Sequence, residues 1–413
     1  MVNKKMLMRI LLIIVTVLVI AAVCVIIFLP VTFAVDKSLI KVNPDYNVEA
    51  IKIDGFTSLF KADSDGNAID SDFKIIGFTD THFDTHKDKG DVTMEYLIRN
   101  IVNEKPDFVV FVGDNITSAI NRRRARQLAN VMEDLGVYWS MTLGNHEGDN
   151  PWSISRKQMV KLFSKYPHCL LESDDKYTDS GEKVWGYGNH VINLLDGNMN
   201  IVRSLYFIDG GSYMTEEDMV KYDAEFDDKD HNDYDYVKDS QIQWYKETVA
   251  KINEINRSPV KSVVFDHIAL PEYKVAYEKI TKETEVTMNA PEYNVCDEDG
   301  DYILAGQRRE IICNSGHNSG FFDAILSSGS TDAVVCGHDH INDFVLSYKG
   351  VILAYNVPSG YSSYNLVSKK MGDKLMKGYS RYIISKDGTF SMFQLHNADL
   401  YPDEQEEINN LYR

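Results

Sequence analysis

The stretch VVCGHDH (residues 334–340) places His338 and His340 directly after an apolar run. Four other mostly apolar runs also end in Asp, Asn or His side chains. They are followed by DTH (80–82), GDN (113–115), GNHE (144–147) and the single residue His267. Polar side chains that follow buried strands gather at one edge of an α/β sheet, so the five segments predict one shared site.

The residue types in these segments indicate metal binding. A strand holds residues i and i+2 on one face, so Asp80 with His82, and His338 with His340, can point into one site. Carboxylate and imidazole ligands suit Mn, Zn or Fe without selecting strongly among them. Each segment alone has an ordinary explanation as a turn, a helix cap or a core histidine. Their conjunction, each after a strand, predicts a metal site.

The flanking glycines and the spacing of the strands bear on the fold. We expect Gly113, Gly144 and Gly337 to let the backbone turn sharply as each strand ends. Residues 94–103 and 122–135 have helical patterns and lie between apolar strands. Such alternation predicts crossover connections and a largely parallel, buried sheet.

We expect residues 36–413 to form one domain, because no Pro-rich or Gly/Ser-rich linker divides them. Within this domain, residues 272–316 have mixed charge and little periodicity. We interpret them as an insertion near the mouth of the site.

The N-terminal segment has the pattern of a membrane anchor. Residues 10–29 are apolar and uncharged, and three basic residues precede them. About 20 residues at ~1.5 Å each span a bilayer core, and the positive-inside rule places the N-terminus in the cytoplasm. We predict a cytoplasmic tip and transmembrane helix over 1–35, with the lipid bilayer as partner and the folded domain outside the cytoplasm. The alternative is a secreted protein, because residues 32–34 loosely match a signal cleavage site.

Charge and cysteine content exclude some functions. The 413-residue chain has a net charge of −19, which argues against a nucleic-acid partner because such binding needs a basic surface. A phosphorylated small substrate is still compatible, since bound divalent cations dominate the local field. Five cysteines do not describe a disulfide scaffold. Cys296 and Cys313 could pair, and the sequence leaves that pairing open.

The order of the five segments resembles that of the calcineurin-like metallophosphoesterase superfamily. The signature of that superfamily is D-x-H, G-D-x-x, G-N-H-[DE], a lone His and G-H-x-H, and this chain is similar to it from residue 80 to residue 340. The segments FDHIALPEY (265–273) and NDF (342–344) resemble the purple-acid-phosphatase-like branch, which includes phosphatases of the yeast cell-cycle regulatory type. The resemblance implies an α/β fold, a four-layer α/β/β/α sandwich of two mixed sheets.

The resemblance also implies two divalent metal ions (Mn, Zn or Fe) that share one carboxylate. The first ion would be held by Asp80, His82, Asp114 and His340. The second ion would be held by Asp114, Asn145, His267 and His338. His146 would act as the acid near the leaving group.

The implied activity is that of a hydrolase acting on phosphoric ester bonds. A hydroxide bridging the two metal ions would attack a phosphomonoester while His146 protonates the departing oxygen. Phosphodiester or nucleotide hydrolysis on the same site is one alternative, and a catalytically silent metal-binding scaffold is another. Thr117 stands where purple acid phosphatases place Tyr, and His82 is a residue that they lack. We therefore expect a colourless site that does not need ferric iron.

Four further side chains have two explanations each. Asp266 or Asp343 could orient a ligand histidine through its second nitrogen, or could be a surface or capping carboxylate. Tyr361 and Tyr364 could wall the pocket, although packing is the more ordinary role.

Overall fold

The computed structural model describes residues 4–28, 46–84, 87–118, 121–222, 233–282, 297, 299–367, 369 and 375–410. The described helices are α1 (Lys4–Phe28), α2 (Lys87–Glu104), α3 (Asn121–Leu135), α4 (Arg156–Phe163), α5 (Glu216–Lys221), α6 (Asp239–Asn256), α7 (Pro271–Thr281), α8 (Phe321–Ser328), α9 (Asn397–Leu400) and α10 (Gln405–Asn410). The described strands are β1 (Asn47–Ile53), β2 (Phe56–Ala62), β3 (Phe73–Phe78), β4 (Phe108–Val112), β5 (Tyr138–Thr142), β6 (His190–Leu195), β7 (Ile201–Phe207), β8 (Lys261–Phe265), β9 (Tyr302–Ala305), β10 (Thr331–Cys336), β11 (Val345–Tyr348), β12 (Val351–Tyr355), β13 (Gly378–Ile384) and β14 (Phe390–His396).

The strands form two mixed sheets. The larger sheet has the order β1-β2-β6-β7-β8-β10-β12-β11-β9, and the smaller has the order β14-β13-β3-β4-β5. Neighbouring strands are parallel over β7, β8, β10 and β12 in the larger sheet and over β3, β4 and β5 in the smaller, where β5 is the edge strand. Antiparallel pairs such as β1–β2, β9–β11 and β13–β14 complete the other edges. The predicted parallel, buried strands are therefore confirmed.

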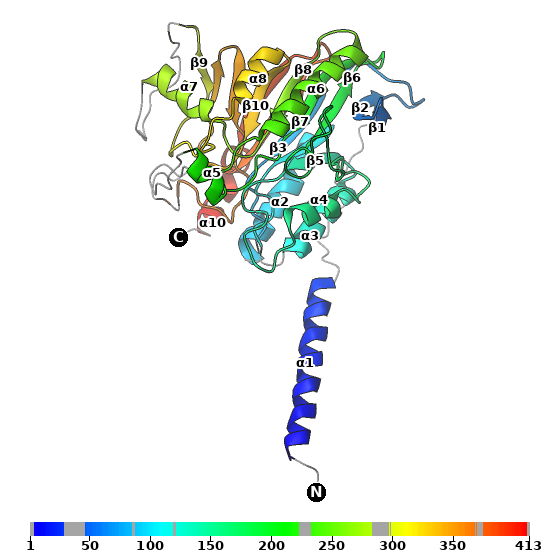
Figure 1. Cartoon of the computed structure of the whole chain (residues 1–413), viewed down its shortest axis with the longest axis vertical. Coiled ribbons are helices and arrows are strands. Elements are labelled where there is room, and N and C mark those ends of the chain that lie inside the picture. The colour runs from blue at the N-terminus through cyan, green and yellow to red at the C-terminus, as the bar shows by residue number, and fades with distance from the viewer. Residues whose placement is uncertain are drawn as a thin grey trace.

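Helices cover the outer face of each sheet (Figure 1). One apolar core packs α6, α7 and α8 against the larger sheet, and a second packs α2, α3 and α4 against the smaller sheet. A third core lies between the two sheets and is built from residues such as Phe73, Val110, Phe207 and Val335. The layers are thus helices, sheet, sheet and helices, as the sequence resemblance implies.

Burial on both faces explains why the central strands are apolar runs. β4 (FVVFV) is buried at all five positions, because α2 and α3 cover one face and the larger sheet covers the other. The predicted helices 94–103 and 122–135 are confirmed within α2 and α3, which connect β3 to β4 and β4 to β5.

Within residues 272–316, the structure describes α7 and β9. β9 pairs with β11 and so forms an edge of the larger sheet. Residues 283–296, including Cys296, lie outside the described residues, whereas Cys313 is a free thiol.

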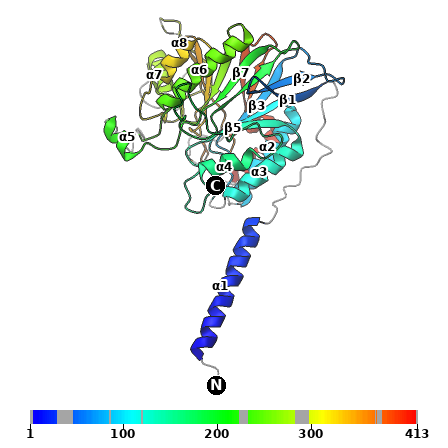
Figure 2. The same cartoon turned by 45° about the vertical axis from the view of Figure 1, so that its right-hand side comes forward.

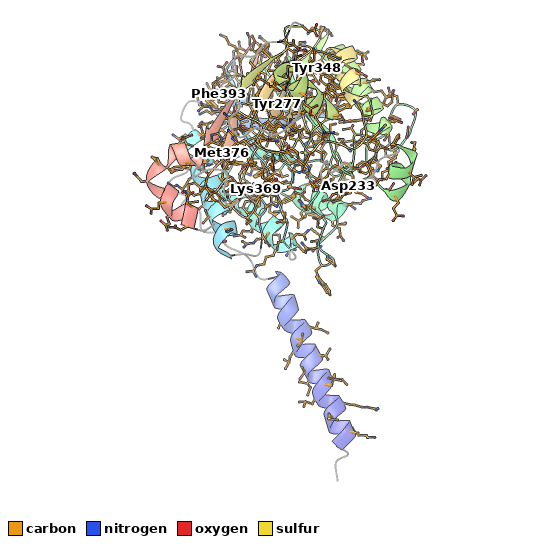
Figure 3. All side chains as sticks on the ribbon, turned by 90° about the vertical axis from the view of Figure 1, so that its left-hand side faces the viewer. Asp233, Tyr277, Tyr348, Lys369, Met376 and Phe393 are labelled. Carbon is orange, nitrogen blue, oxygen red and sulfur yellow. The ribbon has the colours of Figure 1, made fainter. Side chains whose placement is uncertain are left out.

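Helix α1 projects from the rest of the chain as a separate rod (Figures 1 and 2). Side chains fill the body of the molecule densely, while those drawn on α1 point outwards (Figure 3). Among the described residues, no helix is long and apolar enough to cross a membrane. The structure therefore gives no support to the transmembrane helix that the sequence predicts.

Candidate metal centre

The sequence-predicted site residues lie at the carboxyl ends of five parallel strands. Asp80 and His82 follow β3, Asp114 follows β4, and Asn145 with His146 follows β5. His267 follows β8, and His338 with His340 follows β10. The smaller sheet therefore supplies four of the seven predicted ligands, and the larger sheet supplies three. All seven are buried.

The backbone at this edge is strained. Asp80, His82, Asp114 and His338 have positive φ angles of 51°, 44°, 50° and 78°. Such a conformation is uncommon for residues other than glycine and costs of order 1 kcal/mol or more. It is held here by backbone hydrogen bonds from Asp80 N–H to Gly113 O and from His82 N–H to Asp114 O, each of 3.0 Å. The fold thus turns the four side chains inwards against local preference.

The flanking glycines serve two different purposes. Gly113 has a φ of 84°, which fits the expected sharp turn. Gly144 and Gly337 lack a positive φ, and for them close packing is the requirement. A Cβ on Gly144 would lie 2.2 Å from Asp114 Oδ1, and a Cβ on Gly337 would lie 1.9 Å from Thr79 Oγ1. The prediction of a sharp turn at these two residues stays a prediction, and the structure adds close packing as a reason for glycine there.

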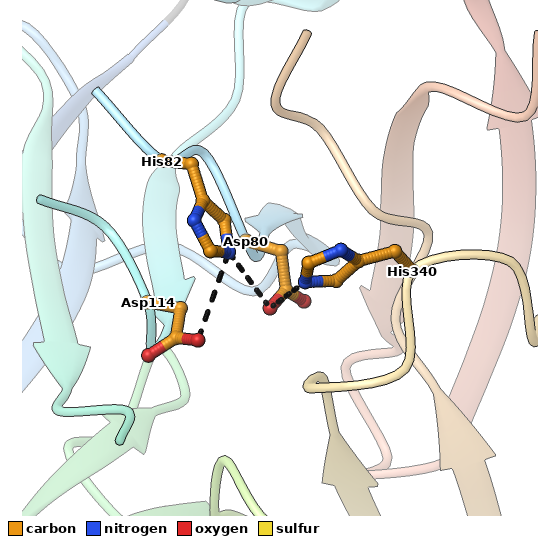
Figure 4. A group of neighbouring side chains, drawn as sticks. All are labelled: Asp80, His82, Asp114 and His340. Carbon is orange, nitrogen blue, oxygen red and sulfur yellow. Dashed lines mark ion pairs between the residues drawn. The ribbon is translucent and has the colours of Figure 1, made fainter. Parts of the chain in front are cut away.

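The first group consists of Asp80, His82, Asp114 and His340, whose ligand atoms all lie within 4.8 Å of one another (Figure 4). His82 Nε2 lies 3.8 Å from Asp80 Oδ1 and 3.6 Å from Asp114 Oδ2. His340 Nε2 lies 3.4 Å from Asp80 Oδ1. Three loops from two sheets thus bring two carboxylates and two imidazoles to one point.

The second group consists of Asp114, His267 and His338, again within 4.8 Å. His267 Nε2 lies 3.3 Å from Asp114 Oδ2 and 3.2 Å from Asn145 Oδ1. Asn145 therefore adjoins this group through its side-chain oxygen. Asp114 belongs to both groups, which is the bridging position implied by the sequence resemblance.

The atoms at the centre of both groups have no hydrogen-bond partner among the described residues. Those atoms are Asp80 Oδ1, His82 Nε2, Asp114 Oδ2 and His338 Nε2. Leaving a buried carboxylate oxygen or ring nitrogen unsatisfied costs about 1–3 kcal/mol, and more for a charged group. By contrast, the other oxygen of Asp80 accepts hydrogen bonds from Thr79 Oγ1 at 2.9 Å and from His338 N–H at 3.0 Å. For Asp80, the unpaired oxygen is therefore the one that faces the group. The Nδ1 atom of His340 is also without a hydrogen-bond partner among the described residues.

The donor set and its spacing fit divalent cations. Two ligands held at about 2.0–2.2 Å from one tetrahedral ion lie roughly 3.3–3.6 Å apart. The nitrogen–oxygen separations within the two groups fall close to this range, at 3.2–3.8 Å. These separations are mostly too long for hydrogen bonds. Carboxylate, amide and imidazole donors together match the chemistry of Mn, Zn or Fe.

The electrostatics of the cluster also favour bound positive charge. Burial lowers the pKa of His338 to about 3 and that of His340 to about 4, so both rings are neutral. Burial alone would lower the pKa of His267, but the charges of Asp114 and Asp80 raise it to about 10. The two buried carboxylates thus attract a cation strongly.

His146 occupies a different position from the seven buried residues. Its side chain is 36% exposed, and its Nε2 lies 3.9 Å from Asp114 Oδ2. Its Nδ1 pairs with the carboxylate of Asp149, and its N–H donates to Asp114 Oδ1 at 2.8 Å. Burial lowers its pKa, but Asp149 and Asp114 raise it to about 9. A protonated imidazole therefore faces the open side of the cluster.

The proposed orientation of a ligand histidine by Asp266 was wrong. The second nitrogen of His267 bonds to the carbonyl of Val112 at 2.8 Å, while Asp266 Oδ1 accepts from the His267 N–H at 2.7 Å. Asp343 instead pairs with Arg309 and lies 3.3 Å from His396. Both carboxylates hold loops in place.

The two tyrosines differ. Tyr361 is buried and packs on Tyr96, which is the structural role. The Tyr364 ring lies 4.5 Å from the His340 ring, and its hydroxyl donates to Glu310 at 2.7 Å. Tyr364 therefore adjoins the first group.

Several residues of this region were not found from the sequence. Asp149 is the partner of His146, and its position three residues later was an available signal. Tyr213, whose hydroxyl accepts from Asn145 Nδ2 at 3.3 Å, carried no such signal. Nor did Arg156, which donates to Gly144 O and pairs with Asp209, because both contacts join segments distant in sequence.

The family model for the calcineurin-like phosphoesterases matches residues 73–342. The chain belongs to this family. The match covers every strand that carries a predicted site residue.

The chain is also similar to curated proteins and to a solved structure. The chain is 29% identical over 332 residues to probable inactive purple acid phosphatase 14 of Arabidopsis thaliana, covering 72% of this chain and 73% of that protein. It is 28% identical over 293 residues to phosphatase DCR2 of Saccharomyces cerevisiae, covering 66% of this chain and 45% of the yeast protein. A dimetal phosphatase from Danio rerio aligns with a TM-score of 0.45 and 13% identity, covering 78% and 95% of the two chains.

Proposed function

We propose that this protein is a metal-dependent phosphomonoesterase. The observation that carries the proposal is the pair of adjoining groups in which buried, unpaired ligand atoms converge and Asp114 is shared. Membership of the calcineurin-like phosphoesterases supports the general reaction class.

In this proposal Asp80, His82, Asp114 and His340 hold one divalent ion, and Asp114, Asn145, His267 and His338 hold the other. When bound, such ions supply positive charge for the phosphoryl oxygens and a water molecule that ionises near neutral pH. Asp114 would help to hold both ions, because it belongs to both groups. The carbonyl oxygen of Val112 orients the His267 ring by accepting a hydrogen bond from its Nδ1–H.

His146 acts on the leaving group. Its exposed ring lies at the edge of the cluster, and Asp149 holds it through Nδ1. Nε2 is then free to donate a proton to the departing ester oxygen. Proton donation of this kind typically accelerates a reaction about 10²–10⁴-fold.

The test is an assay of the full purified chain against p-nitrophenyl phosphate with added Mn, Zn or Fe, together with elemental analysis. We expect turnover of the monoester that a chelator abolishes and that metal restores. Bis-p-nitrophenyl phosphate and nucleotides are run alongside, because diester or nucleotide cleavage on the same residues is the second candidate.

A catalytically silent scaffold is the third candidate, and the word inactive in the name of the Arabidopsis relative gives a reason to test it. A scaffold would bind metal yet hydrolyse none of these esters. A chain that bound no metal would contradict both the enzyme and the scaffold.

The cellular location is a separate proposal that rests on sequence alone. The apolar run 10–29 after basic residues leads us to propose attachment to a lipid bilayer, with the phosphoesterase domain outside the cytoplasm. Extraction of cell membranes with carbonate tests it, because an anchored chain stays in the pellet and a released chain does not.

A further inference from the structure

A cavity of about 730 Å³ opens next to the second group. Tyr213 joins the two, because it lines the cavity and its hydroxyl accepts a hydrogen bond from Asn145. Arg156 lies on the same border, since it lines the cavity and contacts both Gly144 O and, at 3.2 Å, Ser212 Oγ. The cavity therefore borders the residues of the second group.

Five aromatic side chains line the cavity: Trp185, Tyr187, Tyr213, Tyr222 and Tyr236. Three of them expose much of their surface, with Trp185 at 39%, Tyr187 at 37% and Tyr213 at 41%. Aromatic side chains gathered in an open cavity leave apolar surface in water, and such surface commonly marks a binding site. Tyr213 already stacks on Tyr234, and Tyr222 on His317. Trp185 and Tyr187 therefore offer the flat faces on which a planar group can stack.

The segment that carries Trp185 and Tyr187 is fixed before any ligand arrives. The backbone N–H of Trp185 donates to Ser240 Oγ at 3.0 Å, and the backbone N–H of Tyr187 donates to Asp209 Oδ2 at 2.8 Å. Gly186 between them has a φ of 84°, and a Cβ there would lie 2.9 Å from the same Asp209 oxygen. Binding to a wall held in this way loses little conformational entropy.

The charges of the cavity disfavour a second anionic group. Its lining carries the cations Arg156, Lys183, Lys221 and Lys238 and the carboxylates Glu182, Asp209, Asp218, Asp235 and Asp239. Two of these cations are held by carboxylates of the same lining. Lys238 lies 3.1 Å from Asp218 and 2.7 Å from Asp235, and Arg156 pairs with Asp209. A ligand with additional phosphates or carboxylates would meet an excess of negative charge.

We propose that this cavity is the leaving-group site for phosphomonoesters whose alcohol carries an uncharged, planar aromatic ring. The inference rests on the phosphatase proposed above and narrows its substrate class. The phosphate would lie at the metal centre while the ring stacks against Trp185 and Tyr187.

The test compares 2-phenylethyl phosphate with n-butyl phosphate, two alkyl esters that differ mainly in the ring. On the Mn-loaded full chain we expect kcat/KM to be about tenfold higher for the ring-bearing ester, since stacking on an aromatic side chain supports a change of this size. Trp185→Ala should reduce the preference to near unity by lowering kcat/KM for the ring-bearing ester. Tyr187→Ala should reduce the preference as well, which guards against misfolding of a single variant.

The matched control is Phe393→Ala on β14. Phe393 is similarly exposed, at 47%, but does not line the cavity. In Figure 3, Phe393 and Asp233 lie on different sides of the body of the molecule. Asp233 lies next to the cavity, because its carbonyl accepts a hydrogen bond from the backbone N–H of Met214, the residue after the cavity-lining Tyr213. This variant should keep the full preference.

The outcomes separate the two proposals. If neither these esters nor p-nitrophenyl phosphate is hydrolysed, the proposed phosphatase fails. If both esters are hydrolysed at equal rates by the unchanged chain, or if Trp185→Ala slows both equally, the phosphatase stands and the aromatic site is wrong.

Discussion

His146 is the proposed proton donor and is not one of the seven predicted metal ligands, so a substitution there can separate the two roles. It contacts the cluster from the open side, while the seven predicted ligands are buried. Removing its ring deletes the proposed proton donor and leaves every predicted ligand in place.

Replacement of His146 by Asn should therefore reduce kcat for p-nitrophenyl phosphate, by about 10²–10⁴-fold. Metal content by elemental analysis should stay close to that of the unchanged chain. Asp149→Asn is the companion variant, because it keeps the ring and removes its carboxylate partner, and it should give a smaller loss. Release of metal from the His146→Asn variant, with kcat per bound metal unchanged, would contradict the role.

His190 is a buried histidine away from the cluster, and its surroundings bear on stability. Ser140 Oγ lies 2.7 Å from its Nε2, and Gly188 O lies 2.7 Å from its Nδ1. The ring stacks on Phe207 with centroids 4.4 Å apart. Burial lowers its pKa to about 4, so the folded chain holds this ring neutral.

The unfolded chain binds a proton at His190 near its ordinary pKa of about 6.5. Between these two pKa values the unfolded chain therefore binds more protons than the folded chain. The contribution of His190 to the free energy of unfolding is fully present above about pH 6.5 and is lost as the pH falls towards 4. Between about pH 7.5 and pH 5 this group should contribute a loss of about 2 kcal/mol in the free energy of unfolding. Urea unfolding of the unchanged chain and of His190→Gln measures it. Equal pH dependence of the two chains would contradict the prediction.

At the level of elements, the ends of β3 and β10 meet at the cluster although they belong to different sheets. Gly337, just after β10, lies against Thr79 and Asp80, just after β3. A methyl group at Gly337 would overlap Thr79 Oγ1 at 1.9 Å and approach Asp80 Oδ2 at 2.9 Å. The two strand ends would have to move apart.

Gly337→Ala should consequently weaken metal binding by more than about tenfold and lower stability by about 1–3 kcal/mol, the usual cost of overpacking. Titration with Mn followed by thermal unfolding measures both. Gly148→Ala is the control, because a Cβ there meets only Arg156 Cγ at 3.9 Å. It should bind metal as the unchanged chain does, and similar losses in both variants would argue against close packing as the cause.

The central strands could be predicted from the sequence because β4 is buried and apolar throughout, and β3, β8 and β10 are mostly buried and mostly apolar. The edge strands could not be predicted in the same way. β14 (FSMFQLH) is only partly buried and mixes polar with apolar residues, and β9 has four residues, of which Ile303 alone is buried. Their place follows from pairing: β14 forms a hairpin with β13, and β9 pairs with β11, which lies about 40 residues further along the chain.

At the site, too, some features could be predicted from the local sequence and others depend on contacts between distant segments. The order of the Asp and His segments was readable because each directly follows a strand. The pairs Arg156–Asp209 and Tyr213–Asn145 join segments more than 50 residues apart, so only the folded chain brings them together. The roles of the seven predicted ligands remain a prediction that metal analysis tests.

At the scale of the whole molecule, the cluster draws ligands from both sheets. Asp80, His82, Asp114 and Asn145 come from the smaller sheet, and the three remaining histidines come from the larger sheet. Metal bound there would connect the two halves of the sandwich and would bind the folded chain alone.

Saturating Mn should accordingly raise the stability of the chain. At about 100 times the dissociation constant the gain is about 2.7 kcal/mol. Thermal unfolding with Mn and with excess chelator measures the shift. Asp114→Asn removes the carboxylate shared by both groups and should abolish most of it. A shift of equal size in that variant would show that Mn stabilises the chain elsewhere.

The origin of the ligands in two sheets has a mechanical consequence. If one sheet slipped past the other by a single residue, about 3.3 Å, His338 and His340 would lose their reach to Asp80 and Asp114, because a coordination bond tolerates far less stretch. The apolar interface that holds the two sheets in alignment therefore also fixes the distances between the predicted ligands of the two sheets.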